Sequence, residues 1–255
     1  MLTYKIFPLH LGQQEARPSI TTYLQNAGEM KSNPIIAYLI TGNGKAILVD
    51  TGCGDEEWCI KYHNYVTKIS PEMELLNAIR ATGVKPEDVD FIINTHLHHD
   101  HCFNNYKLPD KKIYVQKEEI KYAICPDPCQ WIYYETAQVG LTPSWIAVMN
   151  RFEIVDGDIV LMDGIELVKF SGHTPGSQGV LVNTTDGKYL IAGDVISAYE
   201  SWEGKGIYKH IPVNIHCSVA DCYKDFEKIE KLNVSMVLPG HDMRVLEHSV
   251  YPVER

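Results

Sequence analysis

The sequence predicts an α/β fold, arranged as a four-layer αββα sandwich in which two sheets pack together and helices cover their outer faces. Segments with helical spacing alternate with two groups of short apolar strands, and no repeat, low-complexity tract or Gly/Ser-rich linker interrupts them. The chain has 255 residues, of which 45% are hydrophobic, so one domain spanning 1–255 can form a full core. Periodicity alone does not choose this sandwich over other α/β folds.

The first half of the chain predicts strands and helices in alternation. The turn Gly42-Asn43-Gly44 joins two apolar segments into a hairpin. Helical spacing places Leu75, Leu76 and Ile79 on one face. The expected elements are strands at 35–40, 46–50, 88–94 and 112–115, and helices at 71–81 and 116–124.

The second half predicts a succession of strands, then an amphipathic helix and a last strand. Asp/Gly turns at 156–158, 163–164 and 186–187 separate the strands. The expected elements are strands at 152–155, 159–161, 165–170, 179–183, 188–192 and 234–238, and a helix at 218–232 with Phe226, Ile229 and Leu232 inward.

An insertion at about 125–149 separates the two halves. It is rich in aromatic residues and broken by prolines. One interpretation makes it a wall of an apolar substrate pocket. The other makes it a surface hairpin or the contact of a homodimer, because exposed aromatics often mark such contacts.

Composition excludes several partners. The formal net charge is −10 and no Lys/Arg cluster stands out, so we expect no nucleic-acid partner. No stretch approaches the roughly 20 apolar residues of a membrane-spanning helix. The N-terminal segment 1–8 has no long apolar run and no small-residue cleavage site. We therefore expect a cytoplasmic protein without a membrane partner.

Seven cysteines are scattered along the chain, an odd number that argues against a disulfide framework. We expect most of them to be small buried apolar groups. Cys125 and Cys129 form a C-x3-C pair that leaves a structural zinc site open as an alternative.

The segment Thr95-His96-Leu97-His98-His99-Asp100-His101 carries the main chemical signal. It follows a predicted strand, and a strand end that opens into a loop projects several side chains into one space. Imidazoles and a carboxylate are ligands typical of zinc. Four candidate ligands, His96, His98, Asp100 and His101, would crowd one tetrahedral ion and fit a pair of ions better.

Three further candidate ligands follow predicted strands in the same way. His173 lies in Gly172-His173-Thr174-Pro175-Gly176, Asp194 follows Gly193, and His241 follows Gly240. Glycine allows a sharp turn and a close approach of the ligand. One arrangement repeated at three separate strand ends predicts that these side chains converge with those of 96–101.

The pattern H-x-H-x-D-H, followed by a histidine, an aspartate and a histidine at strand ends, resembles the metallo-β-lactamase superfamily. The resemblance runs from Asp50-Thr51-Gly52 to His241 and is nearest to the N-acyl-homoserine lactonases. It implies the fold, with two divalent metal ions, Zn²⁺ by expectation. One ion would be held by His96, His98 and His173 and the other by Asp100, His101 and His241, with Asp194 bridging both and Asp50 orienting a ligand imidazole.

The resemblance also implies an activity: opening of a small-molecule lactone, the chemistry of quorum quenching, by attack of a metal-bridging hydroxide. We expect Asp100 to carry a proton to the leaving oxygen. Some members have a tyrosine where Ser197 stands. The nearest tyrosine, Tyr199, or a tyrosine of 125–149, is the candidate donor to the developing oxyanion.

Three neighbouring residues have less certain chemistry. We expect His99 to point away from the metals and Cys102 to remain outside the coordination shell. His216 faces either the substrate pocket or the surface.

Other functions remain as alternatives to a lactonase. A hydrolase of a thioester or a cyclic amide fits the same ligands. A β-lactamase would lack the bridging Asp194, a nuclease would not suit the acidic charge, and a redox di-iron protein would place a carboxylate at His98. A non-catalytic metal-binding protein would hold metal and turn over no ester.

Overall fold

The computed structural model describes residues 2–16, 21–25, 28–63 and 66–253, so Met1 of the N-terminal segment lies outside the described residues. The strands are β1 (Lys5–Ala16), β2 (Lys31–Gly42), β3 (Lys45–Val49), β4 (Val66–Lys68), β5 (Phe91–Ile93), β6 (Lys112–Gln116), β7 (Phe152–Val155), β8 (Ile159–Met162), β9 (Ile165–Lys169), β10 (Gln178–Thr184), β11 (Gly187–Gly193) and β12 (Met236–Pro239). The α-helices are α1 (Glu56–Trp58), α2 (Leu75–Ala81), α3 (His99–Cys102), α4 (Lys117–Ile124), α5 (Tyr199–Glu203) and α6 (Val219–Lys231).

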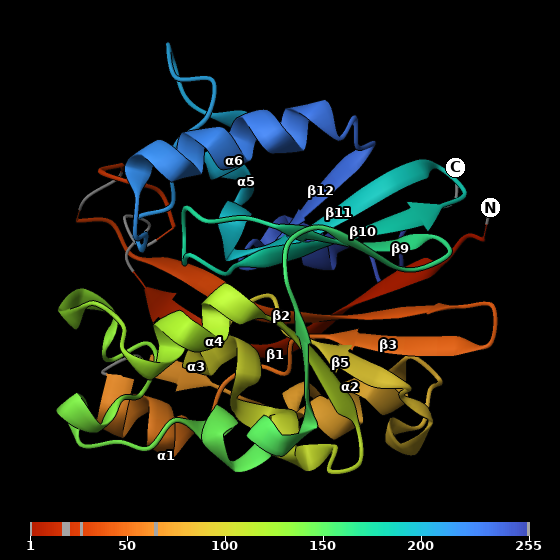
Figure 1. Cartoon of the computed structure of the whole chain (residues 1–255), viewed down its shortest axis with the longest axis horizontal. Coiled ribbons are helices and arrows are strands. Elements are labelled where there is room, and N and C mark those ends of the chain that lie inside the picture. Colours follow the sequence, from red (N-terminus) through yellow and green to blue (C-terminus); the bar gives the residue numbers. More distant parts are fainter. Residues whose placement is uncertain (1, 17–20, 26–27, 64–65, 254–255) are drawn as a thin grey trace.

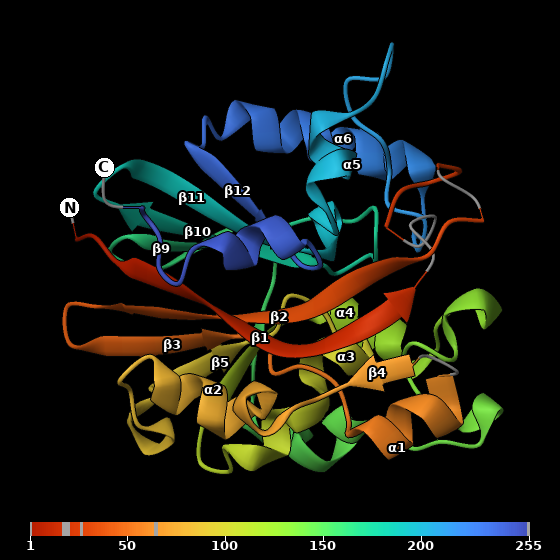
Figure 2. The same ribbon diagram turned by 180° about the vertical axis from the view of Figure 1, so that it is seen from behind.

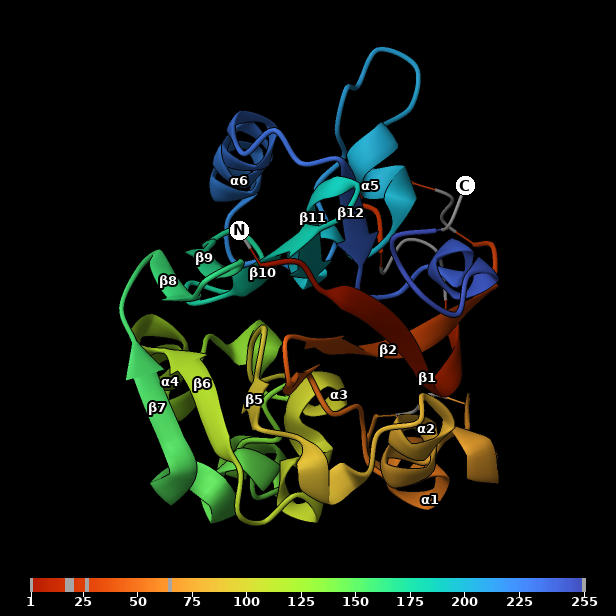
Figure 3. The same ribbon diagram turned by 90° about the vertical axis from the view of Figure 1, so that its right-hand side faces the viewer.

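The described strands form a seven-stranded sheet, in the order β4-β1-β2-β3-β5-β6-β7, and a five-stranded sheet, in the order β12-β11-β10-β9-β8. Helices α1 to α4 cover the outer face of the first sheet, and α5 and α6 cover that of the second (Figures 1 and 3). The predicted four-layer αββα sandwich is confirmed.

Three hydrophobic clusters fill the three spaces between these layers. Leu48 of the first sheet packs in one cluster with Leu75 and Ile79 of α2. A second cluster lies between the sheets and contains residues such as Tyr38 and Leu167. The third joins the second sheet to α6 through residues such as Leu190 and Phe226. Burial of both faces of each sheet explains why its strands are apolar with little alternation.

The N-terminal strands differ most from the prediction. β1 was not predicted, since its sequence contains Pro8 and ends in the polar run Gln13-Gln14-Glu15. It pairs with β2 over nearly its whole length, with a register shift between His10 and Gly12, and crosses the back of the molecule (Figure 2). Pairing with an apolar neighbour therefore makes a strand that the local pattern does not indicate.

Two predicted elements are divided in the structure. The expected helix at 71–81 consists of a 3₁₀ turn, Pro71–Met73, followed by α2, because the backbone of Glu74 between them is extended. The strand expected at 88–94 is only β5, because Pro86–Asp88 forms another 3₁₀ turn. The turn at 156–158 joins β7 of one sheet to β8 of the other and is not a hairpin.

Parallel strands bring several carboxyl ends to one edge of the sandwich. β3 pairs with β5 in parallel, and β11 pairs with β12 in parallel. β9 runs in the same direction as β11, because each is antiparallel to β10. Loops that follow these strands therefore meet at one end of the two sheets. None of the helices in the described part of the chain is both long enough and apolar enough to cross a bilayer.

Candidate metal centre

All seven predicted metal ligands meet at this end of the sandwich. The loop after β5, continuing into α3, provides His96, His98, Asp100 and His101. The loops after β9, β11 and β12 provide His173, Asp194 and His241, respectively. Most of these side chains are buried, and Asp100 is the most exposed, at 17% of its side-chain surface.

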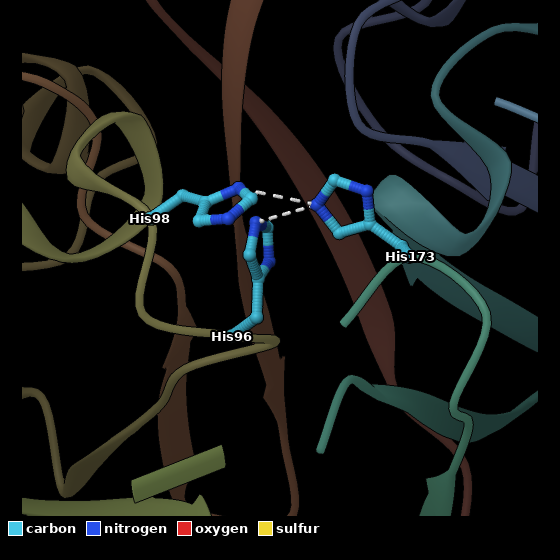
Figure 4. A group of neighbouring side chains, drawn as sticks. All are labelled: His96, His98 and His173. Carbon is cyan, nitrogen blue, oxygen red and sulfur yellow. Dashed lines mark hydrogen bonds between the residues drawn. The ribbon is translucent and has the colours of Figure 1, made fainter. Parts of the chain in front are cut away.

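The first group consists of His96, His98 and His173, whose ring nitrogens point toward one another (Figure 4). Nε2 of His173 lies 3.1 Å from Nε2 of His96 and 3.2 Å from Nδ1 of His98. The three rings cross at 77° to 90°. Because an imidazole lone pair lies in the plane of its ring, crossed rings can aim three lone pairs at one point.

The second group consists of Asp100, His101 and His241. Nε2 of His241 lies 3.7 Å from Oδ2 of Asp100, and Nε2 of His101 lies 3.9 Å from Oδ1 of Asp100. These distances leave room for an ion between the three side chains.

Asp194 lies between the two groups. Its Oδ1 is 3.1 Å from Nε2 of His241 and 3.5 Å from Nε2 of His101. Its Oδ2 is 3.8 Å from Nε2 of His173 in the first group. One carboxylate oxygen thus faces each group.

The outer nitrogens of three imidazoles are fixed by hydrogen bonds. Nδ1 of His101 donates to Oδ2 of Asp50 at 2.8 Å, as expected for Asp50. Nδ1 of His173 donates to the carbonyl of Ile215, and Nδ1 of His241 donates to the carbonyl of Pro34 at 2.8 Å. Such bonds fix the tautomer that leaves Nε2 free to bind a metal.

Burial and charge set the protonation of the group. Burial, with the neighbouring imidazoles, lowers the pKa of His96 and of His98 well below the ordinary value, so both rings are neutral. Burial also acts to lower the pKa of His101, but Asp194, Asp100 and Asp50 outweigh it and raise that pKa to about 10. A concentration of carboxylate charge is therefore present where a cation would bind.

The residues fit a metal centre on a further observation. Nε2 of His101 and Oδ1 of Asp194 are buried and have no hydrogen-bond partner. Buried polar atoms are nearly always partnered, so two such atoms facing each other indicate a ligand for both. Glycine makes the approach feasible: a Cβ at Gly240 would lie 2.6 Å from Oδ1 of Asp194.

A cavity opens over the two groups. Besides metal-ligand candidates it is lined by polar side chains and one aliphatic residue, namely Gln14, Thr21, Asn33, His99, Tyr133, Ser197 and Ile215. Tyr133 comes from the aromatic insertion. Tyr199 does not line this cavity: its ring lies against the guanidinium of Arg244, 4.3 Å from ring centroid to Cζ.

The insertion 125–149 folds into short 3₁₀ turns, Pro128–Gln130, Ala137–Val139 and Ser144–Arg151. Tyr134 and Trp145 are buried, so much of the insertion packs against the helical layer. The ring of Tyr134 contacts that of His98.

The remaining candidates lie outside both groups. Cys102 donates its thiol to the carbonyl of Leu97, and Nδ1 of His216 donates to the carbonyl of Val213 at 2.6 Å. The ring of His99 stacks on that of His63. Cys125 and Cys129 are exposed and belong to no metal-ligand group among the described residues.

Sequence reasoning missed Glu119, a fully buried carboxylate on α4. It accepts hydrogen bonds from the backbone N–H of Leu97 at 2.8 Å, the hydroxyl of Tyr134 at 2.7 Å and the hydroxyl of Thr174 at 2.6 Å. It therefore joins the loop of His96 and His98 to that of His173. A charged residue within an amphipathic helix gives no local signal of this role.

Fold and site together define an αββα protein with a histidine-rich candidate metal centre at the edge of its two sheets. The chain belongs to the metallo-β-lactamase superfamily, whose family model matches residues 33–241.

Curated relatives cover most of the chain. An N-acyl homoserine lactonase of Bacillus sp. is 27% identical over 85% of this chain and 84% of its own length. The N-acyl homoserine lactonase AttM of Rhizobium radiobacter is 24% identical over 95% and 94%, respectively.

Solved structures show the same fold. An N-acyl homoserine lactone hydrolase, with the product N-hexanoyl-L-homoserine bound at its catalytic metal centre, superposes with a TM-score of 0.79 at 21% identity, covering 97% of this chain and 96% of that one. AidC, a dizinc quorum-quenching lactonase, superposes with a TM-score of 0.69 at 17% identity, covering 95% and 89%.

Proposed function

We propose that this superfamily hydrolase opens a lactone or a similar cyclic ester at a binuclear centre. The observation that carries the proposal is the convergence of five imidazoles and two carboxylates from four strand ends, with Asp194 between two groups of ligands. The relatives of known activity that span most of the chain are lactonases, which favours an ester ring over other acyl substrates.

In this proposal His96, His98 and His173 hold one divalent ion, and Asp100, His101 and His241 hold the other, with Asp194 shared. We take zinc as the ion, because neutral imidazoles and carboxylates suit it. When bound, two such ions lower the pKa of a coordinated water toward 7 and polarise a substrate carbonyl.

The residues of the chain then orient and transfer protons. Asp100, the most exposed of the ligands, lies where it can carry a proton to the leaving oxygen. Tyr133 lines the cavity and is our candidate donor to the developing oxyanion. We assign no chemistry to Tyr199, because its ring packs against Arg244 and not over the ligands.

The test is a pH-stat screen of lactones, thioesters and β-lactams on protein whose metal content has been measured. We expect acid release from lactones and much slower release from the other two classes. Turnover of thioesters without lactones would make the protein a thioester hydrolase instead. Metal-loaded protein that turns over none of the three classes would contradict hydrolysis of these substrates altogether.

A further inference from the structure

A second buried group of metal-ligand side chains lies beside the candidate metal centre. It consists of His63, His99 and Glu135, whose donor atoms all lie within 4.8 Å of one another. The exposed fractions of the three residues are 7%, 2% and 1%. They come from three separate segments, namely the π-helical turn Cys59–His63, the start of α3 and the aromatic insertion.

The carboxylate of Glu135 is held on one side only. Its Oε1 accepts a hydrogen bond from Nε1 of Trp58 at 2.6 Å and from Nε2 of His63 at 2.9 Å. Its Oε2 is buried without a partner, and so is Nδ1 of His99. The ion-pair partner of Glu135 among the described residues is His63, not a lysine or arginine. Two unpartnered atoms in a dry site leave both coordination capacity and negative charge unsatisfied.

We propose that His63, His99 and Glu135 bind a further divalent transition-metal ion, such as zinc, outside the binuclear centre. Two imidazoles, one carboxylate and an open position form a common zinc coordination set. The ion would use the free lone pairs on His99 and Glu135 and neutralise the buried carboxylate, which Trp58 already orients. It would tie three segments together next to the loop 96–101, whatever ester the protein hydrolyses.

Binding requires a specific movement of side chains. The rings of His63 and His99 are stacked, with centroids 3.4 Å apart and planes 12° apart. One ion cannot lie in the planes of two parallel rings, since each lone pair lies in its own ring plane. The His99 ring is the one expected to turn, because no hydrogen bond holds its Nδ1. In the metal-bound protein the two rings should therefore cross, as those of His96, His98 and His173 do.

Crystals of the full chain grown with zinc locate the ion directly. We expect an anomalous peak between His63, His99 and Glu135 in data collected above the zinc absorption edge, and its absence in data collected below the edge. A map in which the binuclear centre is occupied and this position is empty, with the two rings still stacked, would overturn the proposal.

Metal analysis of variants gives an independent test in solution. Glu135→Gln keeps the shape of the side chain but removes its charge, and we expect it to bind one zinc equivalent fewer per chain than wild type. Trp58→Phe is the matched control, because it removes a hydrogen bond to Glu135 but no ligand, and it should retain the ion. Equal zinc content in wild type and Glu135→Gln would contradict the site. Neither readout involves ester turnover, so a failure of the proposed activity would not affect this result.

Discussion

The carboxylate of Asp50 lies 2.8 Å from Nδ1 of His101, although 51 residues separate them in the chain. The same carboxylate accepts from the backbone N–H and the hydroxyl of Thr95, each at 2.7 Å. Asp50 itself adopts a positive φ of 62° directly after β3. One side chain therefore fixes both the start of the His-rich loop and the ring of a ligand within it.

Asp50→Asn should weaken the metal centre without dissolving it. The amide keeps an acceptor for Thr95 but loses the charge that holds His101 as a donor, so we expect about 10- to 100-fold weaker metal binding. Competition with a chromophoric chelator measures this directly. Asp110→Asn, at an exposed position, is the control and should bind metal as wild type does. Wild-type affinity in Asp50→Asn would show that the contact does not orient the ligand.

Asp194→Ala should lose at least one metal equivalent together with ester hydrolysis. Asp194 faces both ligand groups, and its removal leaves the imidazoles of His101, His173 and His241 without their shared carboxylate. Elemental analysis and initial rates on the same preparation are the measurements. Full metal content and full activity in this variant would remove Asp194 from the centre.

Glu119→Ala should destabilise the fold and release metal from the first group. The change leaves the N–H of Leu97 and the hydroxyls of Tyr134 and Thr174 without their buried acceptor, at a cost of about 3 kcal/mol. Denaturant unfolding measures the stability, and metal titration measures the site. Glu118→Ala, the exposed neighbour on α4, is the matched control. An equal effect of both variants would contradict a positioning role for Glu119.

Tyr133→Phe should lower kcat on a lactone about tenfold or more with little change in KM, because a donor to the developing oxyanion acts in the transition state. Tyr199→Phe should leave both constants within about twofold, since that ring packs on Arg244. Steady-state kinetics of both variants at equal metal content decide between the two tyrosines. The reverse pattern would restore Tyr199 as the donor.

Asp225 should make stability depend on pH. Burial raises its pKa to about 6, from an ordinary value near 3.8, although it accepts the N–H groups of Ser171 and Gly172. Because the folded pKa is the higher one, the folded state is penalised where Asp225 is ionised, above pH 6. The penalty reaches about 3 kcal/mol and disappears as the pH falls from about 6 to about 4.

The comparison with Asp225→Asn isolates this effect. The stability of the variant relative to wild type should rise by up to about 3 kcal/mol between pH 4 and pH 7, and loss of metal at low pH, which both proteins share, cancels. Denaturant unfolding across this range is the measurement. A constant difference between the two proteins would show that Asp225 titrates normally.

The seven candidate ligands could be identified from the sequence because each one is marked locally. His96, His98, Asp100 and His101 share one segment, and His173, Asp194 and His241 each lie directly after a strand and next to a glycine. The hairpin of β2 and β3 and the helix α6 were also predicted, since their hydrophobic patterns and turn residues depend on neighbours in the chain. These features require no knowledge of what packs against them.

Tertiary structure alone decided the features that join distant segments. β1 is a strand because it pairs with β2, and Glu119 orients the ligand loops because α4 packs beneath them. The choice of Tyr133 over Tyr199 at the cavity, and the meeting of His63 with Glu135, depend in the same way on how the layers pack. The physical reason is that a residue's partners across the fold are set by packing of whole elements, whereas the sequence pattern records only its neighbours along the chain.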